Sequence, residues 1–476
     1  MLFSSIPFIL YFLPITLIVY YILSFSRTAQ NVWLLIVSLV FYAWGEPYYV
    51  LLLLLSIVFN SVLALIMDKK QGKLRKALLV IDIVFNVGML FIFKYLNFIL
   101  EMFGARGRAI EEQLGIVLPI GISFYTFQAL SYVIDVYRQT TKAENPFYVG
   151  LYISFFPQLI AGPIVQYNAV SEQIRNRKCT FDKLSLGISR FAVGVGKKII
   201  LANSFAAIAD NVFNWSNIGT DKLQVPATLA WLGSIAYSLQ IYFDFSAYSD
   251  MAIGLGLCFG FKFRENFNYP YIATSISDFW NRWHISLTDW FRDYVYIPLG
   301  GNRGANRDTM VRNMAIVWAL TGIWHGANWT FIFWGIFYFT FQLLERFLDY
   351  ENHVRSIFLR HVITLFIVNA LWVLFRADNL YQAGRFYMNM LGINDNGFLS
   401  DTAFMLVKEN WLFLILGILF STPVVPKINS WLYQNEDTKV HALYSVLYPL
   451  AMLAMMVVCF SYLIIGSYNP FIYFNF

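Results

Sequence analysis

The sequence is poor in charged residues. Asp, Glu, Lys and Arg make up only 13% of its 476 residues, whereas 58% are hydrophobic. A soluble globular chain is about 25% charged and about 45–50% apolar. This chain therefore has too few polar side chains to cover a water-soluble body, and the deficit predicts that lipid surrounds most of it.

Cysteine is also scarce. Cys179, Cys258 and Cys459 lie far apart and form no CxxC pair, which predicts neither a disulfide framework nor a zinc site. Neither an HExxH sequence nor a His/Cys cluster is present, so we expect no catalytic metal. Cys258 is an alternative nucleophile, but its apolar surroundings favour a packing role.

The net charge of +6 comes from basic residues in short loops between apolar runs. This pattern is typical of membrane topology signals and argues against nucleic-acid binding. Segment 67–76 carries five basic residues and one acidic residue, whereas segment 101–115 carries two basic and three acidic residues. The bias predicts that 67–76 lies in the cytoplasm and 101–115 outside, with the N-terminus outside.

Apolar runs recur along the chain, and about 20 such residues are needed for a helix to cross the hydrocarbon core. The stretches are 6–23, 31–45, 48–66, 77–100, 116–137, 146–165, 185–213, 227–259, 311–325, 328–347, 359–376, 410–425 and 441–466. Because several are short or partly polar, we predict an all-α polytopic membrane protein with about ten to twelve crossings. We expect one membrane domain, 1–476, with lipid-facing helices in 1–115 and the functional core in 116–476.

The first four apolar runs are dominated by Leu, Ile, Val and Phe, whereas the runs from Pro119 onward carry several polar side chains. A charge at the bilayer centre costs about 2.5–3.5 kcal/mol on insertion scales, so such residues survive by facing protein or a wet cavity. We therefore expect the chemistry in the second part of the chain. These polar residues are Gln128, Asp135, Gln158, Lys197, Lys198, Asp210, Gln240, Asp244 and Asp250.

Segment 261–310 is rich in both aromatic and charged residues, so it cannot span lipid as a plain helix. An aromatic stripe at helical spacing predicts one amphipathic helix, interfacial or re-entrant, with Ser277 as N-cap. Pro298 and the glycines that follow end the pattern. The stripe consists of Trp283, Leu287, Trp290 and Tyr294. A simple interfacial anchor is the alternative interpretation.

Two of the five histidines fall in unusual places. His284 lies within this charged segment, and His325 lies between two long apolar stretches, flanked by Gly322 and Gly326. Glycine allows other backbone or a ligand to approach closely. His325 has a plain alternative as a hydrogen-bonded core residue, but an ionisable side chain within a membrane is a functional candidate by default.

A neutral imidazole can take a proton from a hydroxyl group that attacks a thioester. The oxyanion that develops then needs hydrogen-bond donors. The candidate catalytic residues are therefore His325 and His284. Candidate donors and substrate-binding residues are Asn281, Arg282, Trp283, Trp324 and Asn328.

Several long motifs resemble the membrane-bound O-acyltransferase family, and more closely its bacterial alginate and peptidoglycan O-acetylation branch. They are FFPQLIAGPI (155–164), FDFSAYSDMAIGLG (243–256), NFNYPY (266–271), SDFWNRWHISLTDWFRDYVYIPLGGNRG (277–304), GIWHGANWTFIFWG (322–335) and NPFIYFNF (469–476). The resemblance implies a ring of helices around a central pore. It also implies that His325 is the catalytic histidine and His284 the second histidine of the family.

The resemblance further implies acetyl-CoA as donor and a bacterial plasma (inner) membrane location. The partner would be a secreted or periplasmic SGNH-type polysaccharide acetyltransferase. Asp244 and Asp250 match the family pattern, and we expect them to be structural hydrogen-bond acceptors. Two alternatives remain: D-alanyl transfer to teichoic acid, against which the YIPLGGNRG run (296–304) argues, and transport of a small solute.

Overall fold

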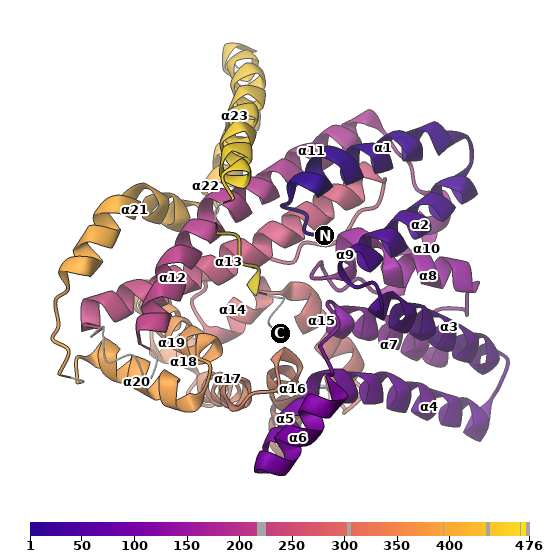
Figure 1. The fold of residues 1–476 in the computed structure, drawn as a ribbon, viewed down its shortest axis with the longest axis horizontal. Coiled ribbons are helices and arrows are strands. Elements are labelled where there is room, and N and C mark those ends of the chain that lie inside the picture. The colour runs from indigo at the N-terminus through magenta and orange to yellow at the C-terminus, as the bar shows by residue number, and fades with distance from the viewer. Residues whose placement is uncertain (217–224, 302–305, 394, 435–437, 467, 473–476) are drawn as a thin grey trace. The chain divides into compact units, whose positions relative to one another are not determined.

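The computed structural model describes residues 1–216, 225–301, 306–393, 395–434, 438–466 and 468–472. Within these ranges the chain consists of helices and loops, without β-strands (Figure 1). The predicted all-α architecture is therefore confirmed. The chain divides into two compact units, and three of the five boundaries between them fall inside α11 (Phe181–Gly196), α13 (Ala227–Cys258) and α15 (Ile285–Phe291).

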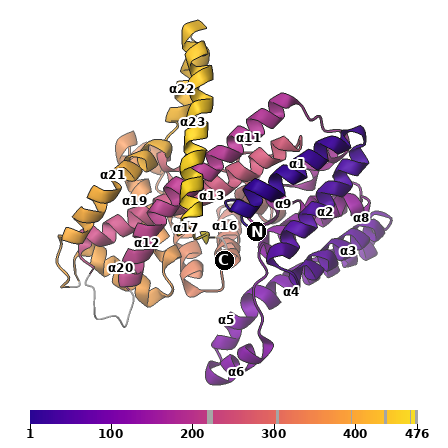
Figure 2. The same cartoon turned by 45° about the horizontal axis from the view of Figure 1, so that its top comes forward.

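The first unit contains Met1–Phe191, Ser249–Glu265 and Asp289–Leu299. In it α3 packs against α7 and α8, and α4 packs against α7. Figure 2 shows the neighbouring helices α1 to α4 of this unit from a second direction. Its helices are α1 (Leu13–Ile22), α2 (Arg27–Gly45), α3 (Tyr49–Asp68), α4 (Gly72–Leu90), α5 (Leu96–Glu101), α6 (Gly104–Leu114), α7 (Ile122–Arg138), α8 (Pro146–Ser154), α9 (Phe156–Leu159) and α10 (Tyr167–Asn176).

The second unit contains Ala192–Tyr248, Asn266–Thr288 and Gly300–Phe476. Both histidines of interest belong to it. Its helices are α12 (Asn203–Trp215), α14 (Ile276–Arg282), α16 (Arg307–His325), α17 (Trp329–Phe347), α18 (Tyr350–His353), α19 (Ile357–Arg376), α20 (Leu380–Leu391), α21 (Asp401–Phe420), α22 (Val424–Gln434) and α23 (Thr438–Ile464).

Eight of the described helical stretches are long and apolar enough to cross a membrane. Each coincides with or overlaps an apolar run that the sequence marks, while the total of ten to twelve crossings and the central pore stay predictions. The eight stretches are Phe8–Phe25, Arg27–Gly45, Val50–Asp68, Gly72–Glu101, Phe181–Trp215, Ile357–Arg376, Asp401–Phe420 and Val440–Ile464.

A tight helical hairpin, α16 and α17, positions His325. An added Cβ at Gly322 of α16 would lie 2.7 Å from the Phe331 carbonyl oxygen, and one at Gly335 of α17 would lie 2.6 Å from the Trp318 carbonyl oxygen. Only glycine permits this backbone approach. Gly322 thus has the close-contact role that the sequence suggests for it.

The segment around His284 differs from the single amphipathic helix predicted there. Helix α14 ends at Arg282, and α15 begins only at Ile285. The predicted N-cap is also wrong. The Ser275 side chain accepts the Asp278 N–H at 3.0 Å, whereas the N–H and hydroxyl of Ser277 both donate to Glu345, at 3.1 Å each. Ser277 is therefore engaged by another helix and does not cap its own.

The apolar run 146–165 is likewise not one continuous helix. It divides into α8 and α9 at Phe155, whose backbone is non-helical, and becomes irregular beyond α9. Pro157 explains the division, because proline lacks the N–H that a continuous helix would use and its ring crowds the preceding turn. Apolar content alone could not reveal this break.

Candidate active site

His284 occupies the break between α14 and α15 and is fully buried. Its φ of 46° lies in the left-handed region, which residues with a side chain rarely adopt. Asn266 supports the turn: its carbonyl oxygen accepts the Ile285 N–H at 3.0 Å, and its side-chain oxygen accepts the Ser286 N–H at 3.1 Å. The Ser286 hydroxyl lies 3.5 Å from Nδ1 of His284.

His284 lies outside the eight candidate spans, between two short helices. Burial removes the imidazole from water, and this desolvation lowers its pKa to about 3. The side chain is therefore neutral at neutral pH. A neutral imidazole offers one hydrogen-bond donor and one acceptor, which suits it to orient a neighbouring group.

His325 is the last residue of α16 and is 4% exposed. Aromatic rings surround its imidazole edge-on: the centroid distances are 5.0 Å to Trp334 and 5.1 Å to Phe375. Trp334 comes from α17 and Phe375 from α19, so three helices build the enclosure. The enclosure keeps bulk water away from the imidazole.

Trp324 joins the two histidines. Its ring centroid lies 4.9 Å from that of His325 and 6.0 Å from that of His284. Phe245 of α13 completes the surroundings of His284 at 4.6 Å. The structure thus brings together two histidines that are 41 positions apart in the sequence, a spacing from which their proximity could not be predicted.

The other predicted site residues have different surroundings. Trp283 is buried in an aromatic cluster, stacked on Phe279 at 5.6 Å and tilted against Trp372 at 4.9 Å. Asn281 is exposed on α14, and Arg282 pairs with Asp278 at 2.8 Å. The substrate-binding roles of these three residues stay predictions.

Asn328 caps α17 by accepting the Thr330 N–H at 3.1 Å, and its amide donates to the Asp378 carbonyl oxygen at 2.8 Å. It also lines a cavity of about 630 Å³ in the second unit. Phe331 and Phe375 line the same cavity, and Phe375 is the ring that touches His325. Phe375 thus links the cavity wall to the histidine.

Much of the remaining cavity lining is polar. Arg376 lies 2.7 Å from Asp210 and 3.8 Å from Asp378, and all three side chains line the cavity. Hydroxyl and amide groups complete this polar lining, namely those of Asn214, Tyr237, Gln240, Tyr468 and Asn469. Asp210 and Gln240 stand out in the sequence as polar residues within apolar runs. Arg376 does not, because it ends an apolar helix where a basic residue is ordinary.

Among the described residues, no group of three or more His, Cys, Asp or Glu side chains could hold a metal ion. The expectation of metal-free chemistry stays a prediction. The two aspartates that match the motifs both accept hydrogen bonds. Asp244 accepts the Ile472 N–H at 2.9 Å, and Asp250 accepts from Arg190 at 2.9 Å.

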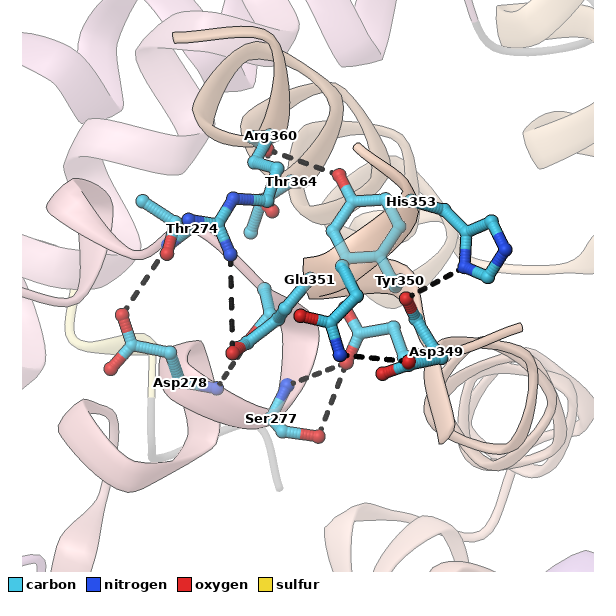
Figure 3. A network of polar contacts seen from close by, with 12 residues as sticks. Thr274, Ser277, Asp278, Asp349, Tyr350, Glu351, His353, Arg360 and Thr364 are labelled. Atoms are coloured by element: carbon cyan, nitrogen blue, oxygen red, sulfur yellow. Dashed lines mark hydrogen bonds and ion pairs between the residues drawn. The ribbon is translucent and has the colours of Figure 1, made fainter. Parts of the chain in front are cut away.

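His353 belongs to a peripheral polar network that surrounds the start of α14 (Figure 3). Its Nδ1 lies 3.1 Å from the Asp349 carbonyl oxygen, and the side chain is exposed. In the same view Asp278 accepts the Thr274 N–H at 3.3 Å. His353 is therefore a helix-end residue, unlike the two enclosed histidines.

Long apolar helices and two buried histidines define a multi-pass membrane protein in which Phe375 connects one of these histidines, His325, to a polar cavity. The sequence model of the membrane-bound O-acyltransferase family matches residues 36–378. The chain belongs to this family. It is therefore a membrane O-acyltransferase, as the motifs predict, and the solute-transporter alternative is not supported.

Named relatives support the same assignment. The chain is 44% identical to the probable alginate O-acetylase AlgI of Pseudomonas aeruginosa, over 82% of this chain and 75% of the relative. It is 33% identical to the peptidoglycan O-acetyltransferase of Helicobacter pylori, over 100% and 98% of the two chains. The teichoic acid D-alanyltransferase of Bacillus subtilis is 30% identical, over 49% of this chain and 60% of the relative.

Two of the recognised motifs extend beyond the described residues. In the GGNRG run, positions 302–304 lie outside them, and so do positions 473–476 at the end of NPFIYFNF.

Proposed function

We propose that the protein moves an acetyl group from cytoplasmic acetyl-CoA across a bacterial plasma membrane toward an extracytoplasmic polysaccharide. Alginate, peptidoglycan or a similar polymer is the final acceptor, reached through a secreted SGNH-type acetyltransferase. Support comes from relatives named for acetyl transfer, which match most of the chain, whereas a D-alanyltransferase matches only about half of it.

The proposed chemistry has His325 as general base. Its neutral imidazole takes the proton of an acceptor hydroxyl, and the freed oxygen attacks the thioester carbonyl carbon. The tetrahedral intermediate collapses as the C–S bond breaks, and CoA leaves as a thiol with the proton from His325. The observation that carries this role is the enclosure of His325, one of whose walls, Phe375, also lines a polar cavity.

Hydrogen-bond donors must stabilise the oxyanion during this step. Trp324 is the best-supported donor, because its ring contacts both imidazoles. In this proposal His284 assists by holding Trp324 and the substrate in place. The remaining predicted substrate-binding residues are Asn281, Arg282, Trp283 and Asn328.

The test is acetyl transfer by purified protein in proteoliposomes supplied with labelled acetyl-CoA and the secreted partner. His325→Ala should lower the rate by about 10²-fold to 10⁴-fold, the usual contribution of a general base. His353→Ala is the matched control, since it removes an exposed imidazole outside the site. Normal transfer by His325→Ala would exclude His325 from the chemistry.

Replacing His284 separates the two histidine roles. His284→Ala should reduce transfer less than His325→Ala does, because a positioning group contributes less than the group that moves the proton. An equal or larger loss at His284 would reverse the assignment.

D-alanyl transfer is the second candidate, favoured by the 30% identity to a teichoic acid D-alanyltransferase. The same proteoliposomes can be given a D-alanyl thioester on a carrier protein in place of acetyl-CoA. Transfer from the carrier but not from acetyl-CoA would establish this alternative.

A further inference from the structure

Five consecutive residues, Tyr468–Ile472, line the cavity beside His325. In Figure 1 this yellow part of the chain runs from α23 back toward α13. We call it the wall segment. Phe471 and Ile472 are buried, whereas Tyr468 is exposed. The cavity wall is thus partly built from a short stretch that follows α23 in the chain.

A buried ion pair holds the wall segment by its backbone. Nζ of Lys198 lies 2.7 Å from Oδ1 of Asp244, and the two side chains are 3% and 1% exposed. Oδ2 of Asp244 accepts the Ile472 N–H at 2.9 Å. Nζ of Lys198 donates to the Pro470 carbonyl oxygen. Each charge therefore binds both its partner and one peptide group of the segment.

Side chains add weaker contacts along the same stretch. The Tyr468 hydroxyl donates to Asp210 at 2.8 Å, and the Asn203 amide donates to Asn469 at 3.1 Å. The Phe471 ring lies 5.3 Å from the Tyr248 ring. The Lys198–Asp244 pair differs from these contacts because it binds the segment with two opposite charges that are both buried.

A buried ion pair is a costly way to stabilise a fold, because desolvation of two charges commonly exceeds their mutual attraction. An apolar pair of similar volume would hold two helices together at least as well. An apolar pair could not bind an N–H and a carbonyl oxygen of a neighbouring segment. The chemistry that distinguishes Lys198 and Asp244 from an apolar pair is therefore their hold on this backbone.

We propose that Lys198 and Asp244 are positioning residues that hold the wall segment against the cavity, so that His325 activates the intended acceptor hydroxyl rather than water. The proposal rests on the proposed acetyl transfer. With the segment released, water enters and His325 takes a proton from it. The hydroxyl oxygen then attacks the thioester, and acetate and CoA thiol leave. The protein becomes a hydrolase of its donor.

A charge exchange tests this role directly. Lys198→Asp/Asp244→Lys retains an ion pair between the same positions. However, aspartate at 198 cannot donate to the Pro470 carbonyl oxygen, and lysine at 244 cannot accept the Ile472 N–H. If the pair only joins its two helices, the exchange preserves function. If the pair holds the wall segment, the charge exchange impairs acetyl transfer. The impairment is then the same as in Lys198→Met/Asp244→Leu, which removes both charges.

The first measurement compares acetate release with acetyl transfer in proteoliposomes. Both double variants should raise the ratio of hydrolysis to transfer by about tenfold or more, the effect of losing one charge-assisted hydrogen bond. Total CoA release should fall by less than this factor, because His325 is untouched. An unchanged ratio in the charge-exchange variant would overturn the proposal.

The second measurement does not depend on catalysis. Ile472→Cys is placed in a cysteine-free background, with Tyr468→Cys as an exposed control. A water-soluble maleimide should label Cys at position 468 in all backgrounds. It should label Cys at position 472 rapidly only in the two double variants, in which the ion pair is exchanged or removed. Equal protection of position 472 in every background would also overturn the anchoring. If acetyl-CoA proves not to be the donor, this labelling still decides whether the pair holds the segment.

Discussion

At the residue scale, His284 combines two unfavourable features, a left-handed backbone and a buried imidazole. A non-glycine residue in such a conformation costs about 1–3 kcal/mol and persists only where the surrounding structure enforces it. Asn266 enforces it here through hydrogen bonds to the two residues that follow. Backbone strain and burial at a single residue are typical of a functional site, where the orientation of the side chain matters more than the stability of the fold.

The neutral state of His284 predicts acid sensitivity of the fold. Its pKa is about 3 when folded and about 6.5 when unfolded, so below pH 6.5 only the unfolded chain binds the proton. Stability is therefore lost as pH falls from 6.5 toward 3. At pH 5.5 this loss is about 1.4 kcal/mol. Thermal unfolding in detergent, followed by tryptophan fluorescence, measures it as a lower Tm than at pH 7.5.

His284→Asn isolates this contribution, because asparagine tolerates the left-handed conformation but does not titrate. The variant should lose less Tm between pH 7.5 and pH 5.5 than the wild type does. The same loss in both proteins would show that His284 does not cause the acid sensitivity.

At the element scale, the α16–α17 hairpin determines where His325 lies, and its close approach depends on Gly322 and Gly335. Gly322→Ala should destabilise the protein by about 1–3 kcal/mol, since the added methyl group would meet a backbone oxygen at 2.7 Å and force the helices apart. Because His325 ends α16, acetyl transfer should fall together with Tm.

Gly384→Ala in α20 is the matched control, because nothing lies within 4 Å of the added carbon. Alanine also favours a helix over glycine, so this variant should keep or slightly raise Tm. If Gly322→Ala and Gly384→Ala have the same Tm, close packing does not fix the hairpin.

The sequence predicts elements well where one local property decides them. Long apolar runs identify the spanning helices, and Gly322 marks the close approach to another backbone. The break at His284 could not be predicted, because it depends on Asn266, which lies 18 positions earlier. Ser275 replaces Ser277 as N-cap because Glu345 of a distant helix engages Ser277.

The same division applies to the site. His284 and His325 can be selected from the sequence because ionisable residues are rare in such surroundings. The contact of Trp324 with both rings, and the approach of the wall segment to Lys198, arise only when distant helices assemble. Tertiary contacts of this kind produce no periodic pattern in a single sequence, so they cannot be predicted from it.

At the scale of the whole molecule, the outer apolar surface requires lipid. In the most apolar stretch of Val440–Ile464, only 6% is buried within the protein. The corresponding share for Asp401–Phe420 is only 11%. Side chains such as Leu443, Leu450 and Leu453 are more than half exposed. Because a contiguous surface of this kind would aggregate in water, the folded state is defined only together with a bilayer.

The orientation in that bilayer follows from loop charge. Segment 67–76 is strongly basic and segment 101–115 is not, and the span Gly72–Glu101 separates them. Basic loops remain cytoplasmic, so Lys70 should lie inside and Arg108 outside.

Single cysteines at these exposed positions test the orientation, in a background that contains Cys179→Ser, Cys258→Ala and Cys459→Ala. A membrane-impermeant maleimide should label Arg108→Cys in intact spheroplasts, but Lys70→Cys only after permeabilisation. The opposite labelling pattern would show that the protein has the opposite orientation, which contradicts the proposed transfer from the cytoplasm outward.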